Sequence, residues 1–526
     1  MNRTHKAGWG FVTGLASAGI TVLVSLAATP LVLKWLGQEK FGAFRAASDW
    51  TGHLMIFDLG LSGALTPLLV RALGQGNQAV RAVLGVGVRL YLGVVLLILA
   101  AGIGLTLFIS RLVPVSPSLA GDLKHGCWLG ILALLAVPLM PFRALAEADQ
   151  RSYLINTLIL FQTFIVTGLG LLLAWSGWGI SGQFLAFATG SVVFLLLLAL
   201  DGRRRWFVPS GMAHQSQPAG QSFAGAATSP PTADLTDPNS IRQEIWKLNW
   251  PNLIQNICGR AGLYTDNLLI AFFWGPALVV PFFLTQRMAV LAQTQLQGVG
   301  NSCWAGLVEL AGKGPSAVFQ RRLIEVTSFV VILGVAVMVP LAAFNRTFIT
   351  LWVGPEAFGG EAVTILAGVN GVLLAVFSLW GLVLSGAGHV ARVVPGVVAA
   401  TVVNIITSVI GAATIGLPGP VLGTSLSFVL VYSWYFPLLL NSHFQVPWRK
   451  LYPAIARPVI IGLPYGLLIE WFARAHPPRG WAPLGLEIVS SALIYLLVAW
   501  ITIFKSAERA EWMLRLRLFW RPWPAR

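Results

Sequence analysis

The stretch LVRALGQGNQAV at residues 69–80 recurs as LVELAGKGPSAV at residues 307–318. Both copies keep the opening Leu-Val pair, the two glycines of Gly-x-Gly and the closing Ala-Val pair. The likeness continues without a gap over residues 35–80 and 273–318, inside a sequence that is almost wholly apolar. Internal repetition of this kind is typical of secondary transporters, whose substrate site lies between the repeats.

The longer alignment pairs Gly37 with Gly275 and Phe44 with Phe282. An even number of predicted membrane spans separates the starts of the two copies. They therefore run in the same direction, and we expect parallel repeats related by an axis along the membrane normal.

The composition excludes a soluble protein. Hydrophobic residues make up 56% of the chain and charged residues only 10%, and the mean hydropathy is +0.76, whereas soluble domains carry about 25% charged residues. Apolar stretches long enough to cross a bilayer recur about fourteen times. The predicted fold is an all-α polytopic membrane protein with two parallel-repeat six-helix bundles and two extra C-terminal helices.

Five segments follow from this pattern. We predict an N-terminal bundle over residues 1–200, a flexible cytoplasmic linker with a short interfacial helix over 201–247, a C-terminal bundle over 248–440, two more spans over 441–504 and a basic amphipathic tail over 505–526. Lys and Arg gather in the loops on the side of both termini, so both termini are predicted to be cytoplasmic. This bias also explains the net charge of +16 without nucleic acid as a partner.

Several stretches resemble one transporter family. PLVLKWLGQEKFGAF at 30–44 and IFDLGLSGALTPLLV at 56–70 resemble the opening two spans of oligosaccharide flippases, in the polysaccharide transporter branch of the multidrug/oligosaccharidyl-lipid/polysaccharide exporter superfamily. TFITLWVGPEAFGGEAVTIL at 347–366 resembles an outer loop of that family, and LVLSGAGHVARVVPGVVAATVVNIITSVI at 382–410 resembles its spans ten and eleven.

The resemblance implies a flippase of the bacterial inner membrane. Such a protein moves a polyprenyl-pyrophosphate-linked oligosaccharide from the cytoplasmic to the outer leaflet by alternating access, for polysaccharide biosynthesis. The implied partners are this lipid-linked substrate, membrane lipids and the polysaccharide polymerase machinery.

Two cations at membrane depth are the first candidates for substrate binding. Arg260 and Arg287 fall inside predicted spans, where a charge is costly unless it faces a cavity or a partner. A guanidinium suits the oxygens of the pyrophosphate that the resemblance implies. Asn256 and Tyr264 lie one turn either side of Arg260, and we expect them to share its face.

Three glutamines give the next predicted span a polar face. Gln286, Gln293 and Gln297 fall on one side of a helix. Their amides suit sugar hydroxyls in a cavity, but amides also join neighbouring helices in lipid without touching substrate. Both interpretations stay open.

Three carboxylates complete the candidate set. Asp49 aligns with Arg287 in the repeat, which predicts either an outer gate or a static pair, unless Asp49 pairs with Arg45 or His53, one turn away on its own helix. Asp58 and Asp266 are candidates for ion coupling. The sequence has no ATPase motif, metal motif or catalytic set, so no cofactor is expected and a proton or sodium gradient is the expected energy source.

Other functions fit the same class of chain. A cation-coupled multidrug exporter of the same superfamily shares the fold, but we expect it to favour carboxylates over arginines in its cavity. A membrane polysaccharide polymerase or transferase is a third alternative, and the short predicted outer loops without paired carboxylates argue against it.

Overall fold

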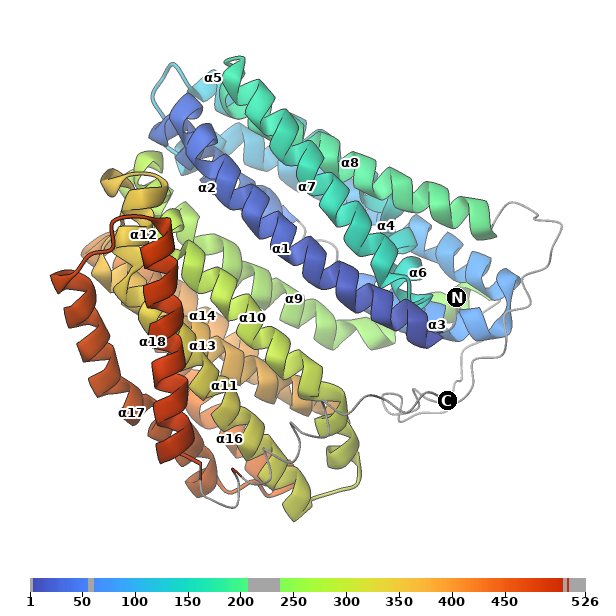
Figure 1. Cartoon of the computed structure of the whole chain (residues 1–526). Coiled ribbons are helices and arrows are strands. Elements are labelled where there is room, and N and C mark those ends of the chain that lie inside the picture. Colours follow the sequence, from blue (N-terminus) through green and yellow to red (C-terminus); the bar gives the residue numbers. More distant parts are fainter. Residues whose placement is uncertain (1–2, 55–60, 207–236, 505–508, 510–526) are drawn as a thin grey trace. The chain divides into compact units, whose positions relative to one another are not determined.

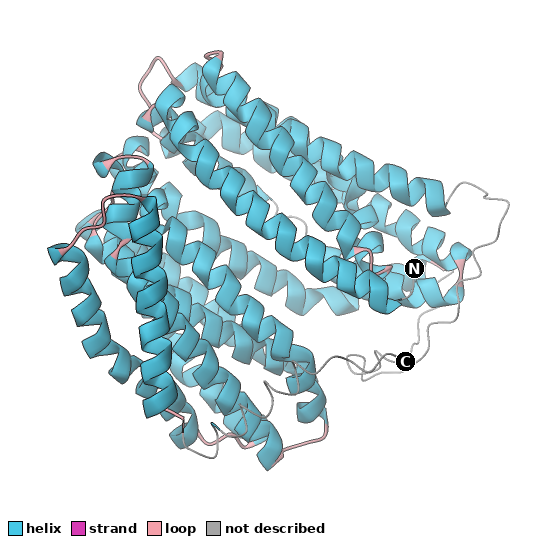
Figure 2. Cartoon of the chain, in the orientation of Figure 1, coloured by secondary structure: helices cyan, strands magenta, loops and turns pink. Residues whose placement is uncertain are grey.

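The computed structural model describes residues 3–54, 61–206, 237–504 and 509, and all regular structure in these ranges is helical (Figures 1 and 2). Helices are the elements that satisfy their own backbone hydrogen bonds in hydrocarbon. In chain order they are α1 (Arg3–Leu36), α2 (Gln38–Leu54), α3 (Leu61–Gln75), α4 (Asn77–Leu112), α5 (Ala120–Ala133), α6 (Met140–Ala148), α7 (Ser152–Trp175), α8 (Gly179–Trp206), α9 (Pro238–Trp274), α10 (Val279–Gly312), α11 (Ala317–Ala343), α12 (Asn345–Trp352), α13 (Glu361–Leu384), α14 (Val390–Ile415), α15 (Pro418–Ser427), α16 (Ser433–Phe444), α17 (Trp448–Ala475) and α18 (Trp481–Thr502).

The described residues contain eleven segments that are long and apolar enough to cross a membrane. One of them, Glu361–Ile415, contains both α13 and α14. The long helix α9 is not among the eleven, because charged and amide side chains interrupt its apolar sequence. The prediction of an all-helical polytopic membrane protein is confirmed, and roughly fourteen spans are compatible with these helices.

The chain divides into two compact units. The first contains Met1–Phe283 and Val397–Gly423, and the second contains Leu284–Gly396 and Thr424–Arg526. In the first unit, α1 packs along α7 and α7 along α8 (Figure 1), while α9 packs against α2, α3 and α4. In the second unit, α11 packs against α13, α17 and α18.

The aligned glycines of the two repeats adopt matching backbone conformations. Gly37 has a φ of 79° and Gly275 a φ of 87°, and the later pair Gly76 and Gly314 has φ values of 109° and 90°. Side chains rarely tolerate these values, so glycine is required at both breaks. The backbone therefore follows the pattern that the sequence repeat predicts.

A close backbone approach explains another glycine of the quoted segments. A Cβ atom on Gly42 of α2 would lie 1.7 Å from the carbonyl oxygen of Pro276. Only glycine fits there, because the obstacle is backbone and cannot move aside cheaply. This contact holds α2 against the chain that follows α9.

The predicted linker begins and ends inside regular helices. Asp201 still belongs to α8, where Arg151 donates to its two oxygens at 2.5 and 2.9 Å. Burial lowers the pKa of Arg151, but the hydrogen bonds and charge of Asp201 outweigh that effect and raise the pKa above its ordinary value. Residues 207–236 lie outside the described residues.

The short interfacial helix expected before span seven is not a separate element. The segment forms the first turns of α9, which begins at Pro238 and runs unbroken to Trp274. Asp237 caps it by accepting from the backbone N–H groups of Asn239 and Ser240. Ile241 is buried in an apolar core together with residues of α3 and α4. This packing against α3 and α4 stabilises the first turns of α9 as part of one continuous helix. The predicted tail lies outside the described residues except for Arg509.

Candidate functional site

A polar cluster joins α2 and α9 in the first unit. Asp49 is 4% exposed, and its Oδ2 accepts a 2.5 Å hydrogen bond from the Nδ2 of Asn267. Its Oδ1 lies 3.6 Å from a guanidinium nitrogen of Arg45, one turn earlier on α2. Among the interpretations that the sequence left open, the local pairing of Asp49 with Arg45 is present.

A second carboxylate borders the same cluster. Asp266 precedes Asn267 on α9 and interacts electrostatically with Asp49. Its Oδ1 is buried and has no hydrogen-bond partner among the described residues. Two nearby carboxylates, one of them incompletely paired, give this part of the helix the chemistry to hold a cation or a proton.

Arg45 also contacts its own repeat counterpart. Its guanidinium carbon lies 4.3 Å from the ring centre of Phe283, the residue with which Arg45 aligns in the sequence repeat. Cation–π contacts of this kind are favourable in desolvated surroundings. This contact gives the Arg45 guanidinium a second partner besides Asp49.

The predicted cation Arg260 lies on the same helix as this cluster. It stands seven residues before Asn267, about 10 Å along α9 and on nearly the same face. Its side chain is half-buried and forms no hydrogen bond or ion pair within the described ranges. Asn256, one turn earlier, is exposed. The side chain of Tyr264 and all of Asp58 lie outside the described residues.

The other candidates lie on α10 in the second unit. Gln286, Arg287, Gln293 and Gln297 are all half-buried. Gln297 donates from Nε2 to the Oγ of Ser378 on α13 at 2.9 Å. Of the two interpretations given for the glutamines, this contact is the one in which an amide joins two neighbouring helices. Cavity lining by these glutamines and the predicted Asp49–Arg287 gate stay predictions.

The sequence did not single out two asparagines that organise polar contacts. Asn267 directly follows Asp266, but only the packing of α9 against α2 reveals its bond to Asp49. Asn345, at the start of the predicted outer loop, donates from Nδ2 to the carbonyl oxygen of Thr285 and the hydroxyl of Thr364, both at 2.9 Å. The only hint in the sequence was that Asn345 directly precedes the segment 347–366, which resembles an outer loop of the transporter family.

The arrangement is that of a multi-pass membrane protein with a transporter fold, and solved structures agree. The structure titled "Lipid II flippase MurJ, inward closed conformation" is similar with a TM-score of 0.66 at 12% identity, covering 94% of this chain and 100% of that one. A point mutant of the Vibrio cholerae MATE transporter VcmN is similar with a TM-score of 0.55 at 14% identity, covering 84% of this chain and 98% of that one.

A third similar structure comes from Pyrococcus furiosus. It is a transporter of the MOP superfamily whose title reports a reverse polarity of its binding pocket, and it matches with a TM-score of 0.55 at 13% identity, covering 82% of this chain and 96% of that one. No family model and no curated protein matches the sequence. The chain thus shares its fold with transporters of the MOP superfamily, in agreement with the resemblance found in the sequence.

Proposed function

We propose that the protein is a flippase that moves a polyprenyl-pyrophosphate-linked oligosaccharide across the membrane by alternating access. The observation that carries this proposal is Arg260, a half-buried guanidinium on a predicted span with no partner among the described residues. An unpaired cation at membrane depth needs an anion, and a pyrophosphate supplies one with oxygens suited to the guanidinium fork. The fold similarity to a lipid II flippase over 94% of the chain supports the same class of substrate.

The Asp49 cluster supports a coupled transporter. Asp266 has a buried oxygen without a partner in the described chain, and intramembrane carboxylates of this kind bind protons or sodium ions in transporters. We assign the coupling role to Asp266, with Asp49 as the neighbouring negative charge that adds to the attraction for a cation.

A cation-coupled multidrug exporter is the second candidate. The same two carboxylates favour it, because a buried pair of acids attracts an organic cation as well as a small ion. Fold similarity to MATE transporters also supports it. The two candidates differ in the sign of the charge that Arg260 would meet, since a cationic drug gains nothing from an arginine.

Flipping in proteoliposomes tests the proposal. A labelled polyprenyl-pyrophosphate oligosaccharide is scored for exposure to the outer leaflet, with and without imposed proton or sodium gradients. We expect Arg260→Ala to lower the initial rate at least tenfold, as the loss of one charge-assisted hydrogen bond predicts, and Arg260→Lys to restore part of it. The same flipping assay on Arg287→Ala tests whether this second predicted cation also binds the substrate.

Arg242→Ala is the matched control, because Arg242 is an exposed arginine at the start of the same helix. It should transport normally. Efflux of an organic cation by the intact protein, with no flipping of several lipid-linked glycans and no effect of Arg260→Ala, would favour the drug exporter.

A further inference from the structure

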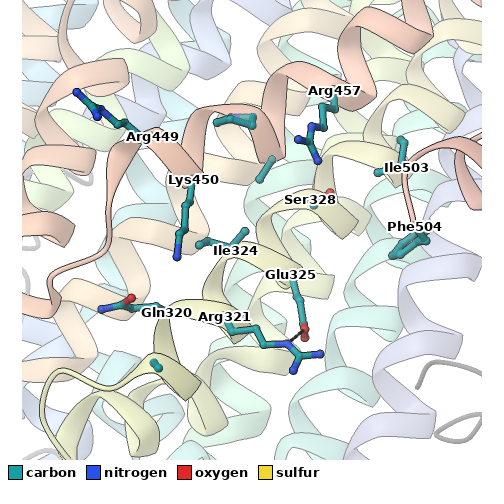
Figure 3. A pocket seen from close by; sticks show the side chains of 13 residues that line it. Gln320, Arg321, Ile324, Glu325, Ser328, Arg449, Lys450, Arg457, Ile503 and Phe504 are labelled. Atoms are coloured by element: carbon teal, nitrogen blue, oxygen red, sulfur yellow. Dashed lines mark hydrogen bonds and ion pairs between the residues drawn. The ribbon is translucent and has the colours of Figure 1, made fainter. Parts of the chain in front are cut away.

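A basic hollow lies entirely within the second unit. It has a volume of about 520 Å³ and lies between the first turns of α11, the first turns of α17 and the end of α18 (Figure 3). These three helix ends lie on one side of the unit. None of the candidate residues for transport lines it.

Positive charge on this hollow exceeds negative charge. Its one carboxylate, Glu325, is already held by Arg321 at 2.8 Å and by Arg322 at 2.7 Å. From α17 come Lys450 and Arg457, both exposed, and neither forms an ion pair within the described part of the chain. Two cations therefore remain without a counter-charge around a space large enough for a small anionic group.

The side chains of these two cations lie toward the hollow. Figure 3 shows Lys450 and Arg457 extending from α17 toward α11, Arg457 on the side of Ser328, whereas Arg449 points away. Lys450 and Arg457 stand seven residues apart, so they share a face of α17 about 10 Å apart along the axis. The Ser328 hydroxyl adds a neutral donor to the lining.

Apolar surface adjoins the charges. Ile503 and Phe504 line the hollow beside the end of α18. Beyond Arg457, α17 carries the exposed aliphatic side chains Ile460 and Leu467, 63% and 75% accessible. A cationic helix end followed by exposed aliphatic residues is the pattern of a membrane interface, where phosphate groups lie above acyl chains.

We propose that this hollow binds the phosphate headgroup of an anionic membrane lipid, with Lys450 and Arg457 as the cationic contacts. The lipid's chains would then run along the aliphatic face of α17. The site would hold the added pair α17 and α18 and the start of α11 to one leaflet, which the charge distribution of the loops predicts to be cytoplasmic. The proposal is independent of the transported substrate.

Native mass spectrometry of the purified full chain counts the lipids that stay bound. The probes are phosphatidylglycerol, a polyprenyl monophosphate and phosphatidylcholine, with inorganic phosphate as a competitor. We expect Lys450→Gln combined with Arg457→Gln to weaken binding of the anionic lipid about twenty-five-fold, because each interfacial cation contributes roughly a fivefold factor in affinity.

The control removes the same charge from the opposite end of α17 and the loop after it. Arg474→Gln combined with Arg479→Gln should bind as the intact chain does, since both residues are exposed and lie outside the hollow. Thermal denaturation of each variant checks folding, and Lys450→Gln alone provides a milder variant with an intermediate expected loss.

The probes separate the sources of the phosphate. Stronger binding of phosphatidylglycerol identifies a structural phospholipid, and stronger binding of the polyprenyl monophosphate identifies the carrier lipid. Either preference supports the site if the double variant loses this binding. Equal binding of phosphatidylcholine, or full binding by a folded double variant, overturns it. Competition by inorganic phosphate supports recognition of the headgroup.

Discussion

The two repeat copies, residues 35–80 and 273–318, have the same backbone breaks but different polar side chains. Gly76 and Gly314 both adopt φ values near 100°, at 109° and 90°, and each separates two helices. Where the first copy has Arg45, the second has Phe283. Similar glycines therefore preserve the path of the chain, while the charges between them have diverged.

The difference shows which features a repeat must conserve. A φ near 100° strains any residue that carries a Cβ, so both copies retain the glycine. A buried charge needs a partner from another helix, and the two copies have different neighbours: Asp49 has Asn267 of α9, while Gln297 of α10 has Ser378 of α13. The first copy thus contributes the buried Asp49 cluster, and the second contributes an amide contact of Gln297 together with Arg287 at the position aligned with Asp49.

Removing the charge of the first copy should have the largest effect on stability. Asp49→Ala leaves Arg45 and Asn267 without their carboxylate, and we expect the free energy of unfolding to fall by about 3 kcal/mol, as for other broken buried pairs. Thermal denaturation in detergent measures the loss.

The control for Asp49 is an exposed pair with the same spacing. Arg143 lies 3.1 Å from Glu147, with side chains 42% and 40% exposed, so Glu147→Ala should cost less than about 1 kcal/mol. Equal losses in the two variants would show that burial of the Asp49 cluster contributes nothing to its strength.

Because the two copies share their backbone breaks, replacing the glycine at either break should lower the free energy of unfolding by the same amount. Gly76→Ala and Gly314→Ala should each lower the free energy of unfolding by about 2 kcal/mol, because alanine is strained at these φ values although nothing lies within 4 Å of the added Cβ. Gly74→Ala, at a helical position with equally open surroundings, should be neutral or stabilising. A loss in only one copy would contradict the structural equivalence of the breaks.

The sequence predicted the fold well because its signals are local. Apolar length and repeated glycines report the helices and breaks without knowledge of their neighbours, and both agree with the structure. The site was less accessible. Arg260 and Asp266 stood out as charges in an apolar span, but the partner Asn267 depends on how α9 packs against α2.

Local pattern also misplaced the boundary between linker and membrane helix. The segment IRQEIWKL has the composition of an interfacial helix, yet it continues into α9. Ile241 is fully buried there, and Glu244 lies 3.2 Å from Arg71 of α3. These long-range contacts, which no local pattern contains, decide that the helix runs on.

The smallest expected effect concerns the amides of the second copy. Gln297→Leu removes one hydrogen bond to Ser378, which should lower the free energy of unfolding by about 1 kcal/mol and leave the flipping rate nearly unchanged. Ser378→Ala and the double variant complete a cycle whose coupling energy measures the bond directly. If Gln297→Leu instead stops flipping while the coupling is near zero, the amide acts on substrate rather than as a contact between α10 and α13.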